Sequence, residues 1–372
     1  MVEALIKMDK KLLVIAGCII FIPIFIIVFL AIIQGCSGGT VTHEKYEQKM
    51  ISAAQKYFND KKKFPKEEAD LVIVKLDKLV SDGYIKSTED LLEDSTCKGE
   101  VSVRRNGSSV EVNGEGFLNY TVTLSCDKYN TTHLVDKIKE NVVTTESGLY
   151  QIGEDYVFKG DKVNNYINIF DVSYRIMSID KNNIIKLVKS EPEIATRVWD
   201  NKFNVEVNHS YGKSIYKDSV ILTYLLNDYE NSKKISKNTK KHIVAYDVCV
   251  GKRSANDYSI DKSLDCSELL EDQVVSMMNV SDFAMASADV DCKTTRDRVC
   301  KNYNYLSKIA VSTWTLNSVS ENTYEVFFIS DGLAEHQNAN SYNEYNIVIY
   351  IDGNELYTSG EGTALNPYII AE

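Results

Sequence analysis

A long uncharged segment near the N-terminus constrains this chain more than any other feature of its sequence. The 22 residues from 12 to 33 carry no charge and are mainly isoleucine, leucine, valine and phenylalanine. At about 1.5 Å rise per residue, a helix over this segment spans roughly 33 Å, which matches a bilayer's hydrocarbon core. Residues 1–11 carry three lysines against two acids, which favours a cytoplasmic N-terminal tail. The sequence therefore predicts a single-pass cell-membrane protein with an extracellular remainder.

Two other signals compete with a membrane-spanning helix. A cleaved signal peptide has a shorter apolar region, of about 7–15 residues. The tetrapeptide Ile33-Gln34-Gly35-Cys36 resembles the processing box of a lipoprotein, in which Cys36 would carry the lipid. The length of the apolar segment favours an uncleaved anchor. Both the anchor and the lipoprotein keep the residues from 40 onward outside and attached to the membrane.

The cysteines predict an oxidising location independently of the apolar segment. Six of the eight cysteines lie beyond the segment and its edge, and they form three local pairs: Cys97 with Cys126, Cys249 with Cys266, and Cys292 with Cys300. Six cysteines allow fifteen connectivities, so pairing them by proximity is an inference. None of these pairs has the Cys-x-x-Cys spacing typical of zinc sites, which favours disulfides over a metal.

The charge of the chain excludes one class of partner. The sequence has 42 basic and 53 acidic residues, a formal net charge of −11. An acidic surface has no general attraction for nucleic acid. We therefore expect no nucleic-acid partner and look instead for a surface glycan or a protein ligand.

Residues 43–142 are predicted to form a small α+β stalk domain. Apolar residues recur every three or four positions over 43–60, as on one face of a helix, and Pro65 prevents its continuation. A second helix is predicted at 76–82, and strands at 100–104, 110–113 and 119–126.

This first domain resembles the soluble part of type IV pilins and pseudopilins over about 43–130. The resemblance rests on the helix, the pair Phe64-Pro65 after it, the segment Leu-Val-Ser-Asp-Gly-Tyr-Ile (79–85) and the antiparallel strands. It implies a domain of one helix packed on a sheet. The chain lacks a prepilin cleavage site, so we expect a tethered stalk, with a pilus component as an alternative.

Residues 148–372 are predicted to form a second domain of short strands and helices. Strands are expected at 156–158, 166–170, 174–179, 184–188, 312–316, 324–330 and 346–351, and helices at 219–229 and 269–277.

The second domain is similar to bacterial surface domains of the formylglycine-generating-enzyme-like group. The similar segments include Tyr-Arg-Ile-Met (174–177), Leu-Thr-Tyr-Leu-Leu-Asn (222–227), Val-Ser-Asp-Phe-Ala-Met-Ala-Ser (280–287) and Gly-Glu-Gly-Thr-Ala-Leu-Asn-Pro-Tyr-Ile-Ile (360–370). That group has a C-type-lectin-like fold. The expected fold class is therefore α+β, with an N-terminal transmembrane helix, a pilin-like domain and a C-type-lectin-like domain.

No catalytic residue is predicted. An enzyme of the formylglycine-generating type needs a reactive cysteine pair, whereas the four cysteines of the second domain fit two structural disulfides. The motif His-Glu-x-x-His does not occur. We expect recognition or adhesion at the cell envelope without catalysis, with an envelope enzyme related to that group as the alternative.

Two groups of residues are candidates for binding a ligand or a metal. Aromatic side chains dominate recognition surfaces, which favours Trp199, Tyr342 and Tyr345 as ligand contacts. Clustered carboxylates supply the hard oxygen atoms that calcium prefers, which favours Asp289, Asp291 and Asp297 as metal ligands. No other cofactor is expected.

Overall fold

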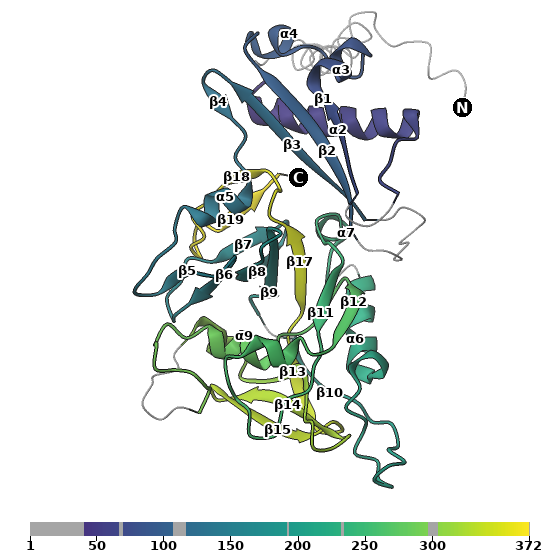
Figure 1. The fold of residues 1–372 in the computed structure, drawn as a ribbon, viewed down its shortest axis with the longest axis vertical. Helices are drawn as coiled ribbons and strands as arrows, with labels where there is room; N and C mark the ends of the chain where they lie inside the picture. Colours follow the sequence, from purple (N-terminus) through teal and green to yellow (C-terminus); the bar gives the residue numbers. More distant parts are fainter. Residues whose placement is uncertain are drawn as a thin grey trace, which may run out of the picture.

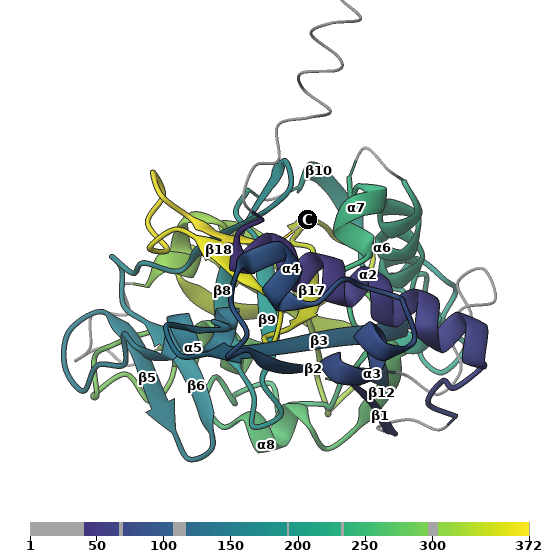
Figure 2. The ribbon, with the colours of Figure 1, turned by 90° about the horizontal axis from the view of Figure 1, so that it is seen from above.

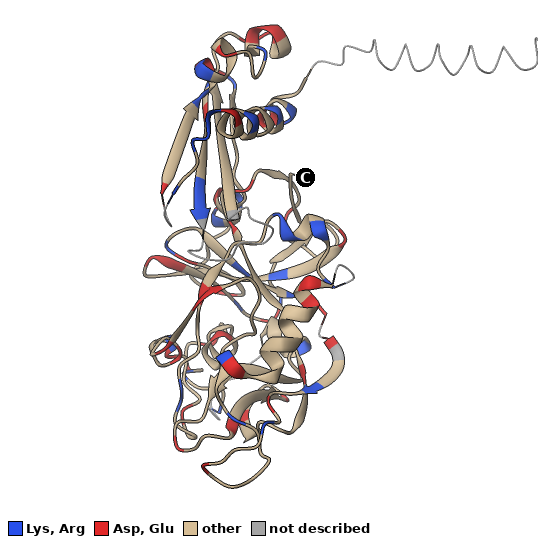
Figure 3. Cartoon of the chain, turned by 90° about the vertical axis from the view of Figure 1, so that its right-hand side faces the viewer, with Lys and Arg blue, Asp and Glu red and all other residues tan. Residues whose placement is uncertain are grey.

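The chain is described here from a computed structural model, which covers residues 41–371 except 67–69, 107–116, 192, 232–233 and 297–303. The described residues form two parts, each with its own hydrophobic core (Figure 1). Acidic and basic side chains are interspersed over both parts (Figure 3).

In the first part, the helix α2 (His43–Lys61) lies against an antiparallel sheet (Figure 2). The helix begins after Thr42, whose hydroxyl accepts a hydrogen bond from the Lys45 N–H, and it ends at Lys62 in a left-handed conformation. This confirms the helix predicted at 43–60. The strands of the sheet follow the order β1 (Leu71–Lys75), β2 (Lys98–Asn106), β3 (Phe117–Cys126) and β4 (Tyr129–Asn130).

Short helices connect this sheet to its surroundings. The helices α3 (Leu76–Ser81) and α4 (Thr88–Leu92) lie between β1 and β2 in the chain. The helix α5 (Leu134–Lys139) falls within the range 43–142 predicted for the first domain, but its buried side chains belong to the second core. Conversely, Leu356 from near the C-terminus packs in the first core, so the two parts interlock.

The largest sheet of the second part combines strands from both ends of that part. Tyr368 pairs in parallel with Ile167, and Val348 pairs with Val188. Strands from the C-terminal end of the chain therefore pair with strands from the beginning of this part. Its order is β17 (Val348–Asp352), β9 (Ile184–Lys189), β8 (Val172–Ile179), β7 (Tyr166–Ile169), β19 (Tyr368–Ile370) and β18 (Tyr357–Ser359), and the hairpin of β5 (Gly148–Ile152) and β6 (Asp155–Lys159) joins at β8.

In Figure 1 the second sheet lies below this one, and the third lies to its right, beside β17. The second has the order β10 (Glu193–Val198), β16 (Tyr342–Tyr345), β13 (Ser312–Ser318), β14 (Glu325–Ser330) and β15 (Leu333–Asn338). The third pairs β11 (Tyr246–Cys249) with β12 (Leu269–Gln273). The helices of this part are α6 (Val220–Glu230), α7 (Lys237–Lys240), α8 (Lys262–Asp265) and α9 (Val280–Met285), with 3-10 turns η1 (Tyr216–Asp218) and η2 (Tyr305–Lys308).

The expected α+β fold class is wrong, because the described residues are mainly β-sheet. Apart from α2 with 19 residues and α6 with 11, every helix that the structure describes has six residues or fewer. Such short helices cap or connect strands and do not form a layer of their own. Most strands pair with a neighbour in sequence, and the pairs β17–β9, β19–β7 and β10–β16 join strands that are distant in sequence.

The transmembrane helix of the expected fold class is not supported either. No helix within the described ranges has both the length and the apolar character needed to cross a bilayer. The segment 12–33, where that helix was expected, lies outside the described residues.

The prediction of a helix at 269–277 is also wrong, because the first half of that segment forms the strand β12. Val248 pairs with Leu270 and Cys249 with Leu269. A disulfide between Cys249 and Cys266 joins the end of β11 to the chain just before β12, which favours antiparallel pairing over a helix. The helix predicted at 219–229 is confirmed as α6, which Ser219 caps by accepting a hydrogen bond from the Leu222 N–H.

Two of the three expected disulfides are confirmed, Cys97–Cys126 and Cys249–Cys266. Cys292 is buried and also disulfide-bonded, but its expected partner, Cys300, lies outside the described residues. That third pairing stays a prediction.

Candidate functional site

A cavity of about 150 Å³ lies in the second part, between the largest sheet and the segment that runs from β11 to α9. We call it the β8–α9 pocket. Strands β6, β8, β9 and β17 supply one wall, and β11, α8 and α9 supply the other. Its polar lining consists of Asp155, Ser178, Asp180, Lys186, Tyr246, Lys262, Asp265, Asn279, Ser281, Asp282 and Tyr350, together with the Cys249–Cys266 disulfide.

One buried ion pair crosses the pocket between the sheet and α9. The ammonium of Lys186 on β9 lies 2.5 Å from an Asp282 carboxylate oxygen. Burial by itself lowers the pKa of Lys186, but the neighbouring Asp282, together with Tyr350 and Asp265, raises the pKa above its usual value. The same carboxylate accepts the Asn279 N–H and so caps α9. Asp282 therefore fixes the helix and neutralises the lysine at once.

A second buried pair stands behind the pocket at Asp265. Arg253, fully buried, donates from Nε to Asp265 Oδ1 at 2.5 Å. Asn317 on β13 donates to the same oxygen at 2.8 Å, and Ser281 on α9 donates to the other. Burial raises the pKa of Asp265, and Arg253 and Ser281 oppose that rise. This carboxylate holds α8, α9 and β13 together.

Asp180 differs from the other carboxylates that line the pocket. Its Oδ1 accepts the backbone N–H groups of Asn182 and Ile184, both at 2.8 Å, and its Oδ2 accepts the hydroxyl of Tyr246 at 3.1 Å. Among the residues that the structure describes, no basic side chain forms an ion pair with it. Burial raises the pKa of Asp180 above its usual value, since hydrogen bonds offset only part of the lost hydration.

Two stacked tyrosines form an aromatic wall beside Asp180. The rings of Tyr246 and Tyr350 lie with their centroids 4.3 Å apart and their planes inclined by 14°. Burial, followed by the neighbouring Asp180, raises the pKa of Tyr246, so its hydroxyl stays protonated and donates to Asp180. The pocket thus combines an aromatic face with an unbalanced carboxylate.

The aromatic residues that the sequence suggested for ligand binding lie elsewhere. Trp199 is fully buried and donates from its indole to the Thr315 carbonyl. Tyr345 is 2% exposed, and its hydroxyl donates to Asp228. Both side chains are core members, so a ligand at the surface cannot contact them. Only Tyr342 of this set is open to solvent, with 70% of its surface exposed.

The carboxylates suggested for calcium do not form a metal site in the described residues. The Asp291 N–H donates to the Asp289 carboxylate at 3.0 Å, as in a turn. No third histidine, cysteine or carboxylate that the structure describes lies close enough to complete a ligand set with these two. Asp297 lies outside the described residues.

The comparisons with known proteins add no family to this geometry. No protein-family model matches the sequence, and no curated protein or solved structure matches it. The resemblances to pilins and to the formylglycine-generating-enzyme-like group therefore stay predictions. The function has to be argued from the pocket.

Replacing Arg253 with alanine is expected to destabilise the second part by about 3–5 kcal/mol, because it leaves Asp265 buried without a counter-charge. Urea unfolding measures the loss. The matched control is Arg253→Ala combined with Asp265→Asn, which removes both charges and should lose clearly less stability. A single variant that loses under about 1 kcal/mol would contradict a structural role for this pair.

Proposed function

We propose that this chain is a non-enzymatic recognition protein that acts outside the cytoplasm. Its β8–α9 pocket binds one amine-bearing sugar unit of a surface glycan. The observation that carries this proposal is Asp180, a half-buried carboxylate that lines a cavity and has hydrogen bonds but no cationic partner among the residues that the structure describes.

The charge of the pocket supports an amine. Four carboxylates line it (Asp155, Asp180, Asp265 and Asp282) against two lysines (Lys186 and Lys262), which gives −4 + 2 = −2. Arg253 compensates Asp265 from behind, so one negative charge remains, on Asp180. A protonated amine of the ligand would neutralise it through a charge-assisted hydrogen bond, which is stronger than one between neutral groups.

The shape and lining of the pocket support a sugar. A cavity of about 150 Å³ is smaller than the pockets that enclose drug-sized ligands, so it suits a single ring. Tyr246 offers an aromatic surface to the apolar face of such a ring. Ser178 and Asn279 add groups that can exchange hydrogen bonds with hydroxyls.

Two observations support the location and the absence of catalysis. Disulfides persist in oxidising compartments, and two are present in the described residues. None of the described residues that line the pocket is a histidine, so neither Ser178 nor Ser281 has an imidazole base there to activate it.

Glucosamine is the probe for this proposal, with glucose as its neutral analogue. We expect calorimetric titration to show that Asp180→Asn weakens glucosamine binding about 10- to 100-fold, the loss of one charge-assisted hydrogen bond, and changes glucose binding little. Asparagine keeps an oxygen for the two backbone N–H groups, so the variant should fold.

The matched control for that titration is Asp331→Asn, an exposed turn residue with φ of 48°, a conformation that asparagine tolerates. This variant should bind glucosamine as the wild type does. A wild type that binds the two sugars equally, or binds neither, would overturn the proposal. Binding should persist in EDTA, because the pocket needs no calcium.

An envelope oxidase of the formylglycine-generating type is the second candidate, and one observation favours it. The Cys249–Cys266 disulfide lines the same pocket, and Cys266 is exposed. Exposed disulfides are the more easily reduced ones. That activity would need the two cysteines as thiols.

Thiol alkylation followed by mass spectrometry of the native protein separates these two candidates. We expect Cys249 and Cys266 to resist alkylation unless a reductant is added, as a structural disulfide does. Labelling of both without reductant, together with copper-dependent oxidation of a cysteine peptide, would favour the oxidase.

A further inference from the structure

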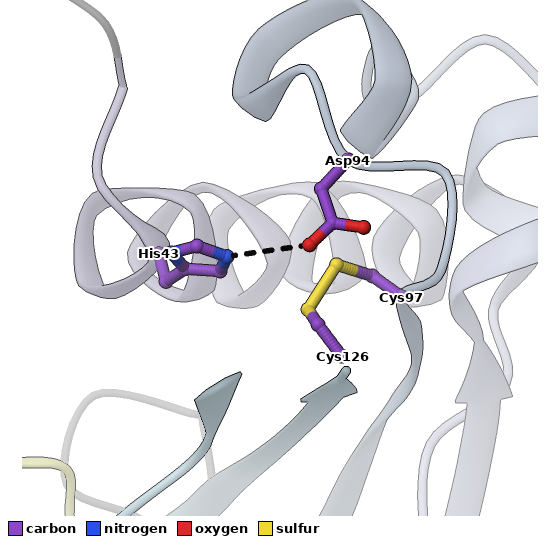
Figure 4. A group of neighbouring side chains, drawn as sticks. All are labelled: His43, Asp94, Cys97 and Cys126. Atoms are coloured by element: carbon purple, nitrogen blue, oxygen red, sulfur yellow. Dashed lines mark ion pairs between the residues drawn. A yellow bond between two sulfur atoms is a disulfide. The ribbon is translucent and has the colours of Figure 1, made fainter. Parts of the chain in front are cut away.

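Four side chains that bind metals in other proteins meet in the first part (Figure 4), and none of them lines the β8–α9 pocket. His43 is the first residue of α2, Asp94 follows α4, and the two cysteines stand at the paired ends of β2 and β3. One ligand atom from each lies within 4.8 Å of all the others. We call this group the α2–α4 cluster; its members are His43, Asp94, Cys97 and Cys126.

The imidazole of His43 points into the cluster and has no hydrogen bond there. Its Nε2 is buried and lacks a hydrogen-bond partner among the described residues, although an Asp94 carboxylate oxygen lies 4.0 Å away. A buried nitrogen without a partner costs free energy in a folded protein. Its position beside two sulfurs and a carboxylate suits a metal ligand.

Neighbouring groups already hold the histidine and the aspartate in place. The ring of His43 stacks on Tyr129 with centroids 4.4 Å apart. Thr96 donates from its N–H and its hydroxyl to Asp94 Oδ1, at 2.8 and 2.6 Å, which leaves Oδ2 directed toward His43. Such supporting contacts orient the ligands in known metal sites.

We propose that the α2–α4 cluster binds one Zn²⁺ when its disulfide is reduced. Zinc takes four nitrogen, sulfur or oxygen ligands in a tetrahedron, with bonds of about 2.0–2.3 Å that place the ligand atoms roughly 3.3–3.8 Å apart. The cluster needs only a small contraction of its histidine and aspartate, together with separation of the two sulfurs. In the disulfide state the sulfurs are bonded to each other and the site is closed to metal.

The chemistry balances with a dithiol as the reductant. A thiolate of the dithiol attacks one sulfur, and its second thiol then releases the mixed disulfide. Two electrons and two protons pass to Cys97 and Cys126, and the dithiol becomes a disulfide. Zinc binding then displaces the two thiol protons to solvent. The same two strand ends are thus joined by a covalent bond in oxidising surroundings and by zinc in reducing ones.

Cobalt titration of the full chain tests this proposal independently of the sugar pocket. The protein is reduced without oxygen by a phosphine, which competes for metal less than a dithiol does. We expect one equivalent of Co²⁺ to give the visible bands of tetrahedral cobalt and a thiolate charge-transfer band, both removed by Zn²⁺. The unreduced protein should give neither.

Variants identify the ligands in that titration. Cys97→Ser with Cys126→Ser should abolish the spectrum, and His43→Ala and Asp94→Asn should each weaken cobalt binding at least tenfold. His43→Ala keeps the disulfide, so its fold can be verified by circular dichroism before reduction.

Two control variants should keep the spectrum. His209→Ala removes an exposed histidine, and Cys249→Ser with Cys266→Ser removes the other described disulfide. A reduced wild type without tetrahedral cobalt would overturn the proposal. So would a spectrum that survives in the variant without Cys97 and Cys126, or affinities unchanged by both His43→Ala and Asp94→Asn.

Discussion

The buried pair of Arg253 and Asp265 is the interaction on which the second part depends most. Arg253 donates to Asp265 and also to the carbonyls of Ser259 and Asp261, so it organises the loop before α8. Asp265 in turn binds α9 through Ser281 and the central strand β13 through Asn317. Because buried charges are costly unless fully paired, this network admits few alternative arrangements. It sets the distance between α8 and α9, and therefore one wall of the β8–α9 pocket.

The carboxylates that line the pocket differ in whether a basic side chain compensates their charge. Asp282, Asp265 and Asp155 each pair with a basic side chain, and the pairs of Asp282 and Asp155 connect strands of the largest sheet to α9 and α8. Within the described part of the chain, Asp180 accepts hydrogen bonds only from neutral donors, in its own turn and on Tyr246. Neutral donors stabilise a carboxylate less than a cation does, and burial raises the pKa of Asp180 as a result. A cationic ligand would supply a positive charge beside Asp180. This charge compensation is the physical basis of the proposed recognition.

Local features of the sequence predicted part of this structure, and distant pairing explains the rest. The three- and four-residue spacing at 43–60 predicted α2, and proximity in sequence correctly paired Cys97 with Cys126 and Cys249 with Cys266. The apolar residues at 269–277 suggested a helix. The spacing of apolar residues carries no information on the partner strand β11, which lies on the other side of a disulfide-closed loop. Trp199 and Tyr345 were placed on the surface by residue type alone, although both are buried. No spacing signal pointed to the pocket, since Asp180, Tyr246 and Tyr350 converge from three separate segments. The one local sequence feature that marked Asp180 was its position just before a turn with two asparagines. An aspartate in that position usually hydrogen-bonds only to the backbone of the turn.

Carbon-13 NMR of the Asp180 side-chain carboxyl, followed against pH with and without saturating glucosamine, tests the central claim most directly. Without ligand, the pKa of Asp180 should lie above that of an ordinary aspartate, because burial penalises its charged form. A bound amine favours the carboxylate, so the pKa should fall when glucosamine is present and stay unchanged with glucose. Affinity for glucosamine should correspondingly decline as the pH falls through the pKa of the bound state. A pKa that does not respond to glucosamine would contradict the proposed recognition.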